Sequence, residues 1–352
     1  MIRDKYAGLL SLDRSDMLGK IAGLSGQLKA GVSLLKGVRL QAFKPENIVI
    51  AGLGGSAICG DLLKAIYEKE LKIPVEVSRN YGLPAWAGKK TLCFVISYSG
   101  NTEETVSAFL EAKKKRAHII AVATGGKIAE LAEKSKIPLI KIPCGFLPRA
   151  ALGYMFISAD MALKKMNLLK HDAVAEKETI NIMGKLSKEC SPSRPLALNP
   201  AKRLAGLLKG RIPIVYGASG ITDSVARRWK GQISENAKVL SFFNSFPELN
   251  HNELVGWSGN RGFAKHTAVV FLSDKACGGR IKLQMQVAED LIKRKTEVVI
   301  KLEGKGDSLM ARMFYLIMLG DFASAYLGLL NNTDPSPIEA INALKKRLKS
   351  AR

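Results

Sequence analysis

The segment "IVIAGLGGSAICGDLLKAIYEK", residues 48–69, places a short apolar run before a glycine-rich turn and a longer polar and apolar mixture. Residues 48–51 favour a buried strand, "GLGGSAICGD" is typical of a tight turn, and "LLKAIYEK" favours a helix. A strand followed at once by a turn and a helix is the first part of a βαβ unit. The segment therefore predicts a parallel sheet, provided that the unit recurs along the chain.

The unit does recur in the first half of the sequence. Residues 92–96 precede "SYSGNTEE" and the helical run "TVSAFLEAKKK", and residues 118–122 precede "ATGGK" and "IAELAEKS". A last short apolar run, "IPLIKIP", follows them. Short apolar strands that alternate with longer helical runs indicate right-handed crossovers and a parallel sheet flanked by helices.

The pattern stops and restarts once. The stretch "CSPSRPLALNP", residues 190–200, is rich in proline and serine and indicates a linker. Beyond it, "IPIVYGASGITDSVARRWK" repeats the unit of residues 48–66, and "HTAVVFLS", "GGRIKLQMQVAEDLIKRK" and "TEVVIKLEG" repeat strand, helix and strand. We expect a helical extension of one or two helices at 1–45, a first domain at 46–190, a linker at 191–200 and a second domain at 201–352. A final helix over "SPIEAINALKKRLK" closes the second domain.

Composition and charge narrow the classes of function that the chain can have. The chain has 352 residues, of which 47% are hydrophobic, and only five cysteines and four histidines. The cysteines form no CxxC pair, so we expect reduced thiols, a cytoplasmic location and no metal centre. The apolar run 313–330 contains Asp321 near its middle, which favours a buried core helix over a membrane span. The net charge of +23 leaves nucleic acid open as a partner, but the basic groups follow helical spacing and indicate solvated faces that attract phosphorylated substrates.

Two loops contain residues of the kinds that bind ligands. Gly52, Gly54 and Ala57 match a GxGxxA dinucleotide pattern, with Glu76 about 20 residues further on. The second loop, "ISYSGNTEET" at residues 96–105, contains several hydroxyls where a strand would end. Hydroxyls and the free amides at a helix start can surround a phosphate dianion, so this loop predicts a phosphate site. The alternative is that its hydroxyls only cap the following helix.

A specific resemblance appears when these motifs are taken together. "GLGGSAICGD", "SYSGNTEET", "PRAALGY", "SENAK" and "ELNHNELVGW", in this order, resemble the bifunctional phosphoglucose/phosphomannose isomerase family. The resemblance implies an α/β fold of two doubly wound sugar isomerase (SIS) domains, each with a mainly parallel sheet flanked by helices. It also implies interconversion of glucose 6-phosphate, and of mannose 6-phosphate, with fructose 6-phosphate in glycolysis or gluconeogenesis. The route it implies is a metal-free enediol mechanism without cofactor.

The resemblance also assigns roles to residues of this chain. Phosphate binding is implied for Gly55, Ser56, Ser97, Ser99 and Thr102. Catalytic roles are implied for Glu235 as the base that moves the proton, Arg149 as the group that steadies the enediolate, and His251 and Lys345 in ring opening, with Lys346 as the alternative to Lys345. Tolerance of the mannose epimer is implied for Ser336, with Thr333 as the alternative. Ala57 and Cys59 depart from the usual pattern of the glycine turn.

These roles fit simple chemistry. A carboxylate such as Glu235 can reach both carbons of an open-chain sugar phosphate, and a fixed guanidinium such as Arg149 favours the anionic intermediate. In the family, the histidine at the position of His251 is contributed by the partner subunit, so we expect a homodimer. We expect neither a nucleic-acid nor a membrane partner. The rival hypotheses are a non-catalytic SIS-domain regulator that binds sugar phosphates, an NAD-dependent oxidoreductase and a nucleic-acid binder.

Overall fold

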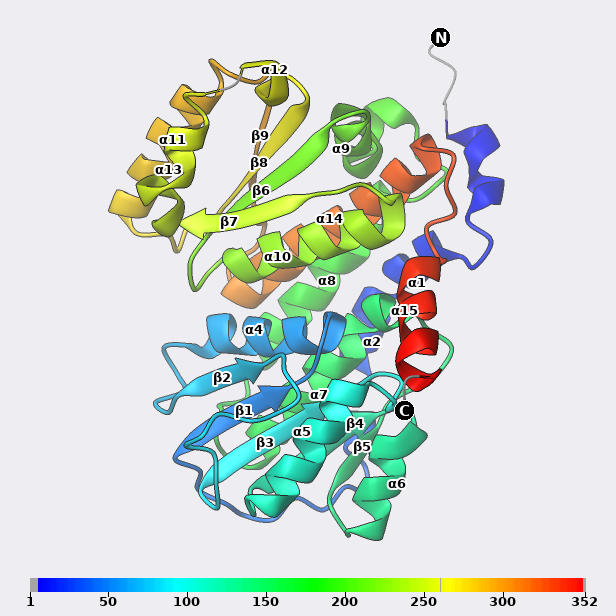
Figure 1. Cartoon of the computed structure of the whole chain (residues 1–352), viewed down its shortest axis with the longest axis vertical. Coiled ribbons are helices and arrows are strands. Elements are labelled where there is room, and N and C mark those ends of the chain that lie inside the picture. Colours follow the sequence, from blue (N-terminus) through cyan, green and yellow to red (C-terminus); the bar gives the residue numbers. More distant parts are fainter. Residues whose placement is uncertain (1–5, 260, 351–352) are drawn as a thin grey trace.

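Two stacked α/β halves make up the computed structural model, which describes residues 6–259 and 261–350 (Figure 1). The sheet of the first half has the strand order β2-β1-β3-β4-β5, and every pairing in it is parallel. Its strands are β1 (Asn47–Ala51), β2 (Val75–Ser78), β3 (Thr91–Ile96), β4 (His118–Ala123) and β5 (Leu139–Lys141). The strand order reverses between β1 and β3, which opens a crevice at their carboxyl ends, where ligands of such sheets bind.

The second half repeats this arrangement with one strand fewer. Its sheet has the order β7-β6-β8-β9, again parallel throughout. The strands are β6 (Ile212–Ala218), β7 (Phe242–Phe246), β8 (Thr267–Ser273) and β9 (Val298–Glu303). The α/β class and the repeated module predicted from the sequence are therefore confirmed. The edge strands β2 and β7 were not predicted, because neither contains a continuous buried run.

Helices surround and join the two sheets. Those of the first half are η1 (Ala7–Leu12), α1 (Met17–Ala22), α2 (Leu24–Lys29), α3 (Gly31–Leu34), α4 (Gly55–Tyr67), α5 (Glu103–Lys114), α6 (Gly126–Lys134), η2 (Pro148–Ala150), α7 (Leu152–Lys165) and α8 (Ala173–Glu189). The second half has η3 (Leu196–Leu198), α9 (Pro200–Leu208), α10 (Asp223–Gln232), η4 (Ile233–Ala237), η5 (Glu248–His251), α11 (Glu253–Gly256), α12 (Arg261–Ala264), α13 (Gly279–Ile292), α14 (Leu309–Leu330) and α15 (Glu339–Ser350). The leading region is thus a series of short helices rather than the one or two expected.

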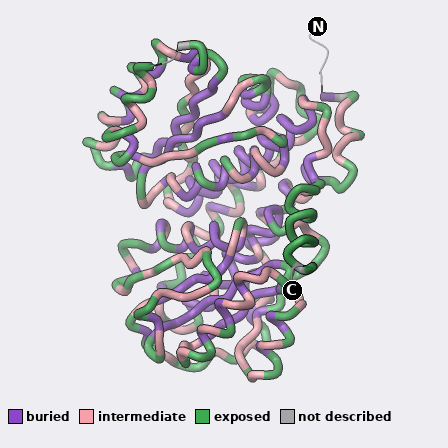
Figure 2. The backbone as a smooth tube through the Cα atoms, in the orientation of Figure 1, coloured by how far each residue is buried: buried purple, intermediate pink, exposed green. Residues whose placement is uncertain are grey.

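The largest core lies between the two sheets, as the buried segments of Figure 2 show. Alternate residues of β1 face opposite sides, so Ile48 and Ile50 join this central core while Val49 joins a second core. The second core lies under α5 and α6, and a third lies between the second sheet and α13. The central core contains residues of both halves, so the two sheets pack around one shared core.

Helix α14 forms the centre of that shared core. It contacts α8, α9 and α10, and its most apolar stretch is completely buried. It is the one helix of the described chain that is long and apolar enough to cross a membrane. Asp321 in its middle is paired with Arg228 of α10, with both side chains 3% exposed. The sequence prediction of a buried core helix is confirmed.

The connection at residues 190–200 is held in place by side chains. Asn199 caps α9 by accepting a hydrogen bond from the Lys202 amide at 2.9 Å. The Lys202 ammonium donates to the carbonyls of Pro192 and Arg194, each at 2.9 Å. This segment joins α8 to α9 and remains the predicted boundary between the two domains.

Candidate active site

The glycine turn after β1 brings three segments into close contact. Gly54 has φ +53°, a backbone conformation that L side chains rarely adopt. A Cβ at Gly52 would lie 2.9 Å from the Ile96 carbonyl oxygen at the end of β3, and one at Gly55 would lie 3.1 Å from the Pro148 carbonyl oxygen. The glycines thus let the start of α4 approach both the end of β3 and the short helix η2.

Ser56 occupies the first turn of α4. Its side chain is buried, and its hydroxyl lies 3.2 Å from the Met155 sulfur of α7. Sulfur is a weak acceptor, so little free energy would be lost if the hydroxyl rotated toward an anion. The structure therefore places Ser56 directly after the glycine turn, with its hydroxyl directed at α7.

The hydroxyl loop after β3 leaves the start of α5 open. Ser97 donates to the Thr102 hydroxyl at 3.1 Å, and Thr102, the N-cap residue, makes no capping bond with its side chain. Ser99 is exposed and accepts a hydrogen bond from the Asn101 amide at 3.2 Å. The alternative that Thr102 caps the helix is therefore wrong. The Thr102 side chain is therefore not used as a cap, and the exposed Ser99 hydroxyl faces solvent at the start of α5.

The loop is held rigid by its neighbour. Gly100 has φ +67°, and a Cβ there would lie 1.8 Å from the Gly125 carbonyl oxygen. The Asn101 side chain accepts a hydrogen bond from the Lys127 amide at 3.0 Å, at the start of α6. Only glycine at position 100 fits this contact, which constrains the backbone of the hydroxyl loop.

A cavity of about 220 Å³ lies between the two halves, where α4 faces α10. Gly54 and Gly55 form part of one wall, and the rest comes mainly from the second half. The ionisable residues in its wall are Arg79, Arg149, Arg227, Arg228, Lys230 and Glu235. Five of these six are cations, so the cavity favours an anionic ligand.

Arg149 and Glu235 meet in this cavity although 86 positions separate them. The Nη1 atom of Arg149 lies 3.3 Å from Oε2 of Glu235, and the two side chains are 3% and 33% exposed. Burial lowers the pKa of the Arg149 guanidinium, and the Glu235 carboxylate opposes that shift. The structure thus joins a fixed buried cation to a carboxylate that solvent or substrate can reach.

Three further acceptors hold the guanidinium in place. Nε of Arg149 donates to Oδ1 of Asn236 at 2.7 Å, and Nη2 donates to the carbonyls of Pro335 at 2.7 Å and Ser336 at 2.9 Å. Together with Glu235, these acceptors account for four of the five N–H groups of an arginine. The remaining N–H is on Nη1, next to Glu235, and is available to a substrate oxygen.

A buried polar network fixes these groups from behind. Asn236 donates to the Ser324 hydroxyl at 2.9 Å, and both oxygens of Asp321 accept from Arg228, at 3.0 and 2.6 Å. Arg228 in turn donates to the Arg149 carbonyl at 2.9 Å. Burial raises the pKa of the Asp321 carboxyl, and the Arg228 guanidinium opposes that shift. The network ties α14 and α10 to η2.

Glu235 is presented by an unusual backbone. It lies in η4, a single π-helical turn that continues α10 and ends at Lys238, whose φ is +56°. Such π-turns are rare and frequently occur at functional sites. Sequence reasoning found Glu235 through the "SENAK" motif but missed Asn236 and Lys238 of the same motif. It noticed Asp321 only as a charge in an apolar run.

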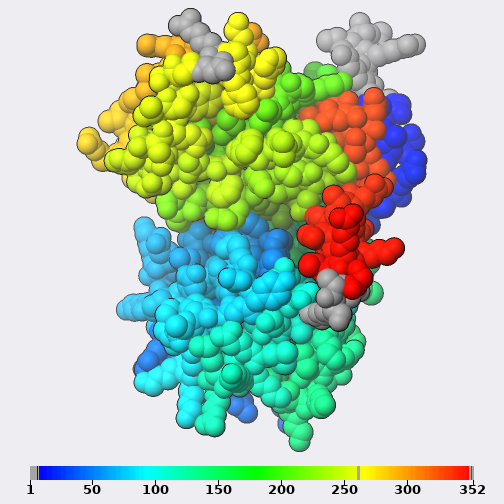
Figure 3. All heavy atoms as spheres, in the orientation of Figure 1, coloured from blue at the N-terminus to red at the C-terminus, as the bar shows by residue number. Residues whose placement is uncertain are grey.

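Two of the predicted catalytic residues lie apart from this cavity. His251 is exposed at the end of η5, and Lys345 is exposed on α15, as is its alternative Lys346. Figure 3 shows α15, coloured red, on the surface at the junction of the two halves. Neither His251 nor Lys345 lines the cavity that contains Arg149 and Glu235.

The two candidates for epimer tolerance differ in their surroundings. Ser336 is buried, and its hydroxyl has no partner among the residues that the structure describes. Thr333 lines a second cavity of about 550 Å³, which Glu235 and Lys238 also line. Glu235 therefore borders two cavities, and Ser336 approaches the first only through its carbonyl contact with Arg149.

No group of three or more His, Cys, Asp and Glu side chains that could hold a metal ion occurs in the described part of the chain. Glu76, the residue expected for a dinucleotide ribose, is exposed on the edge strand β2. A metal-free reaction without cofactor remains a prediction.

Both domains of the chain resemble known proteins. The family model of the bacterial phospho-glucose isomerase C-terminal SIS domain matches residues 197–348, and the SIS domain model matches residues 43–142. The chain is 45% identical over 311 residues to a bifunctional phosphoglucose/phosphomannose isomerase of Caldicellulosiruptor bescii, covering 88% of this chain and 92% of the relative. A protein of the same description from Aquifex aeolicus is 34% identical, with 86% and 91% covered.

A solved structure shares the fold. A glucose-6-phosphate isomerase-like protein from Thermus thermophilus aligns with a TM-score of 0.61 at 17% identity, over 94% of this chain and 96% of the other. At this identity the likeness supports the two-domain SIS fold and nothing finer.

Proposed function

Because the chain belongs to the bifunctional phosphoglucose/phosphomannose isomerase family, we propose that it interconverts glucose 6-phosphate and mannose 6-phosphate with fructose 6-phosphate. The observation that carries the proposal is the contact of Arg149 with Glu235 at 3.3 Å, in a cavity that also borders the glycine turn before α4. One ligand can therefore lie against the first turn of α4 and the Glu235 carboxylate together.

Glu235 is the base in this proposal. Its carboxylate removes the proton from C2 of the open-chain aldose and returns it to C1, while the hydroxyl proton at C2 moves to the oxygen at C1. A single carboxylate on one face of the substrate can reach both carbons. The partial exposure of Glu235 supports the role, because its oxygens are open to a ligand in the cavity.

Arg149 stabilises the intermediate. The enediolate carries negative charge on oxygens at C1 and C2, and a guanidinium held by fixed acceptors needs no reorganisation to bind it. The bonds of Arg149 to Asn236, Pro335 and Ser336 support this role. Its remaining N–H lies on the nitrogen that faces Glu235, where the charge develops.

The phosphate is bound, in this proposal, by the loops of the first half. Ser97, Ser99 and Thr102, with Gly55 and Ser56 at the start of α4, supply the donors. The lack of a capping bond from the Thr102 side chain and the close contact at Gly100 support the assignment. Binding the phosphate at one end of the substrate orients C1 and C2 toward Glu235.

We further propose a cytoplasmic homodimer whose partner subunit contributes His251 for ring opening, with Lys345 as a second ring-opening group. The exposure of both residues within one chain supports a role for them at a subunit interface. A mixture of Glu235→Gln and His251→Ala subunits tests this. Activity recovered on mixing supports a shared site, and no recovery contradicts it.

The direct test of the reaction is an assay of the purified protein in EDTA. Glucose 6-phosphate and mannose 6-phosphate are offered separately, and fructose 6-phosphate is measured. We expect activity with both substrates. Activity with glucose 6-phosphate alone contradicts the second substrate, and loss of both activities on chelation contradicts the metal-free route.

A further inference from the structure

We propose that Lys238 is a positioning residue for the reaction, which holds the backbone of Glu235 against residues 334–336. The inference rests on the proposed function, because it takes Glu235 as the base. It assigns a role to a side chain that lines the 550 Å³ cavity beside Glu235 but does not line the 220 Å³ cavity that contains Arg149.

The backbone at Lys238 directs its side chain back toward Glu235. Lys238 ends the π-turn of η4 in the left-handed conformation, with φ 56° and ψ 37°. Its ammonium donates to the carbonyl of Glu235 at 2.9 Å, to that of Asp334 at 2.8 Å and to that of Pro335 at 3.1 Å. An ammonium has three N–H donors, and these carbonyls account for all of them.

The same segment is held from its other side by Arg149. Its Nη2 donates to the carbonyls of Pro335 and Ser336, so the Pro335 carbonyl accepts from both cations. Residues 334–336 are thereby fastened to the two elements that carry the base and the guanidinium. This segment also leads into α15, whose Lys345 is the proposed second ring-opening group.

The Glu235 carboxylate depends on this backbone support. Among the described residues, the one side chain that pairs with this carboxylate is Arg149, through its Nη1 atom. A base that serves both C1 and C2 requires accurate placement, and a displacement of ~1 Å can lower the rate on the order of 100-fold. The Lys238 contact with the Glu235 carbonyl restrains the residue from its main-chain side.

The simpler alternative is that Lys238 only caps a helix end, as lysines commonly do. Lys209 offers a matched comparison, because it is the residue at the C-terminal end of α9, is exposed, and caps that helix through its backbone amide. It lines neither cavity beside Glu235. Replacing its side chain changes a lysine at a helix end without touching the site.

The experiment compares Lys238→Met, Lys238→Arg and Lys209→Met with the wild type. We measure kcat and KM for glucose 6-phosphate, and thermal melting for each variant. For Lys238→Met we expect kcat to fall on the order of 10- to 100-fold while KM stays within about threefold. We expect little change in melting temperature. Lys238→Arg restores most of kcat, because a guanidinium also donates to carbonyls, and Lys209→Met behaves like the wild type.

Other results overturn the inference. A Lys238→Met enzyme with wild-type kcat contradicts the inference. A lower kcat also contradicts it if the melting temperature falls as well and Lys238→Arg does not restore kcat. If Lys238→Met does not fold, Lys238→Gln replaces it. An arginine variant more active than the glutamine variant at equal melting temperature supports the inference, and equal activities contradict it. A wild type without isomerase activity refutes the proposed function itself, and this inference with it.

Discussion

The two halves of the molecule share one strand order but fill the carboxyl edges of their sheets differently. Ala51 pairs with Val95 in the first sheet, and the corresponding pair in the second is Tyr216 with Phe271. Ser97 of the first half therefore corresponds to Ser273. In the first half this edge carries hydroxyls before an uncapped helix.

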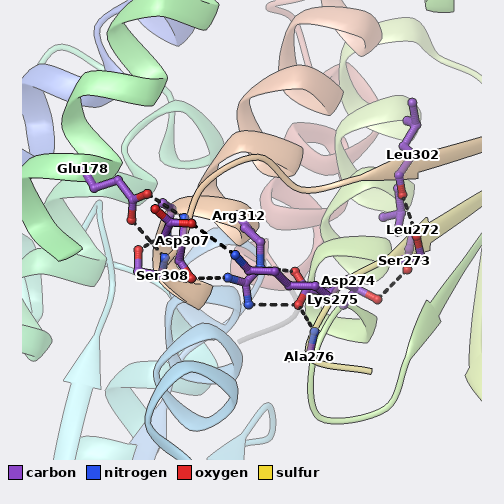
Figure 4. Close-up of polar contacts among 12 residues, drawn as sticks. Glu178, Leu272, Ser273, Asp274, Lys275, Ala276, Leu302, Asp307, Ser308 and Arg312 are labelled. Carbon is purple, nitrogen blue, oxygen red and sulfur yellow. Dashed lines mark hydrogen bonds and ion pairs between the residues drawn. The ribbon is translucent and has the colours of Figure 1, made fainter. Parts of the chain in front are cut away.

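In the second half the same edge is closed by its own side chains. Asp274, the residue after Ser273, accepts two hydrogen bonds from Arg312 of α14 at 2.7 and 3.0 Å (Figure 4). Both side chains are buried. Thr222 donates its hydroxyl proton to the Leu272 carbonyl at 2.7 Å and accepts from the Ala218 amide at 2.8 Å. The Arg312 guanidinium and the Thr222 hydroxyl are thus bound within the second half, whereas the Ser99 hydroxyl of the first half is exposed.

The two edges therefore differ in their side chains although the sheets share a strand order. In the proposed function, the first half binds the phosphate at its strand ends, and the second half supplies Glu235 from the π-turn at a helix end. A contact between the halves accompanies this division. Glu178 of α8 accepts from the amides of Asp307 and Ser308 at the start of α14, at 2.6 and 2.9 Å (Figure 4).

The largest effect is expected from removing the base of the second half. Glu235→Gln keeps the size of the side chain but cannot accept the proton, so we expect kcat to fall about 10²- to 10⁴-fold with little change in KM. Glu297→Gln, an exposed glutamate of the same half, is the control and keeps wild-type kcat. A Glu235→Gln enzyme with near-normal kcat would place the base elsewhere.

The closed edge of the second half predicts a loss of stability without loss of chemistry. Asp274→Ala leaves the buried Arg312 guanidinium without its carboxylate, which costs about 3–5 kcal/mol of unfolding free energy. Urea unfolding measures this loss, and kcat of the folded enzyme should be unchanged. If kcat fell while stability stayed the same, the second edge would take part in the reaction, and the comparison would fail.

The open edge of the first half predicts a change in substrate binding without a loss of stability. Ser99→Ala removes an exposed hydroxyl from the phosphate loop, and we expect KM for glucose 6-phosphate to rise on the order of 10-fold, as for a hydrogen bond to a charged group. Lys275→Ala, at the corresponding position of the second half, serves as the control and keeps KM. Equal effects at both positions would show that the two edges are not distinguished by the substrate.

The smallest effect concerns the contact between the halves. Burial tends to raise the pKa of Glu178, but the hydrogen bonds from Asp307 and Ser308 outweigh it and lower the pKa below its ordinary value of 4.5. The contact therefore contributes stability above about pH 4.5, which is lost as the pH falls through the lowered pKa. Glu178→Gln should flatten this acid-side part of the stability profile, measured by thermal melting between pH 3 and 6. A stability profile that Glu178→Gln leaves unchanged contradicts the proposed contribution of this contact.

The elements that the sequence predicted well are those with a strong local pattern. Strands β1, β3, β4, β6 and β8 are apolar runs bounded by turns, and their burial follows from that pattern. The strands β2 and β7 lie at sheet edges, and Leu240 and Phe242 beside or within β7 are exposed. An edge strand needs no continuous apolar run, so periodicity does not reveal it.

The motifs by themselves determined which residue types are available for phosphate binding and for proton transfer, because glycine turns, hydroxyl loops and helix starts are local features. Only the tertiary structure decided that Arg149 and Glu235 meet at one cavity and that the Ser336 carbonyl holds the Arg149 guanidinium. It also decided that Asp321 and Arg228 support them from the core and that Lys238 closes the π-turn. Such contacts join residues far apart in the chain, and their distances follow from how the two sheets pack around one shared core.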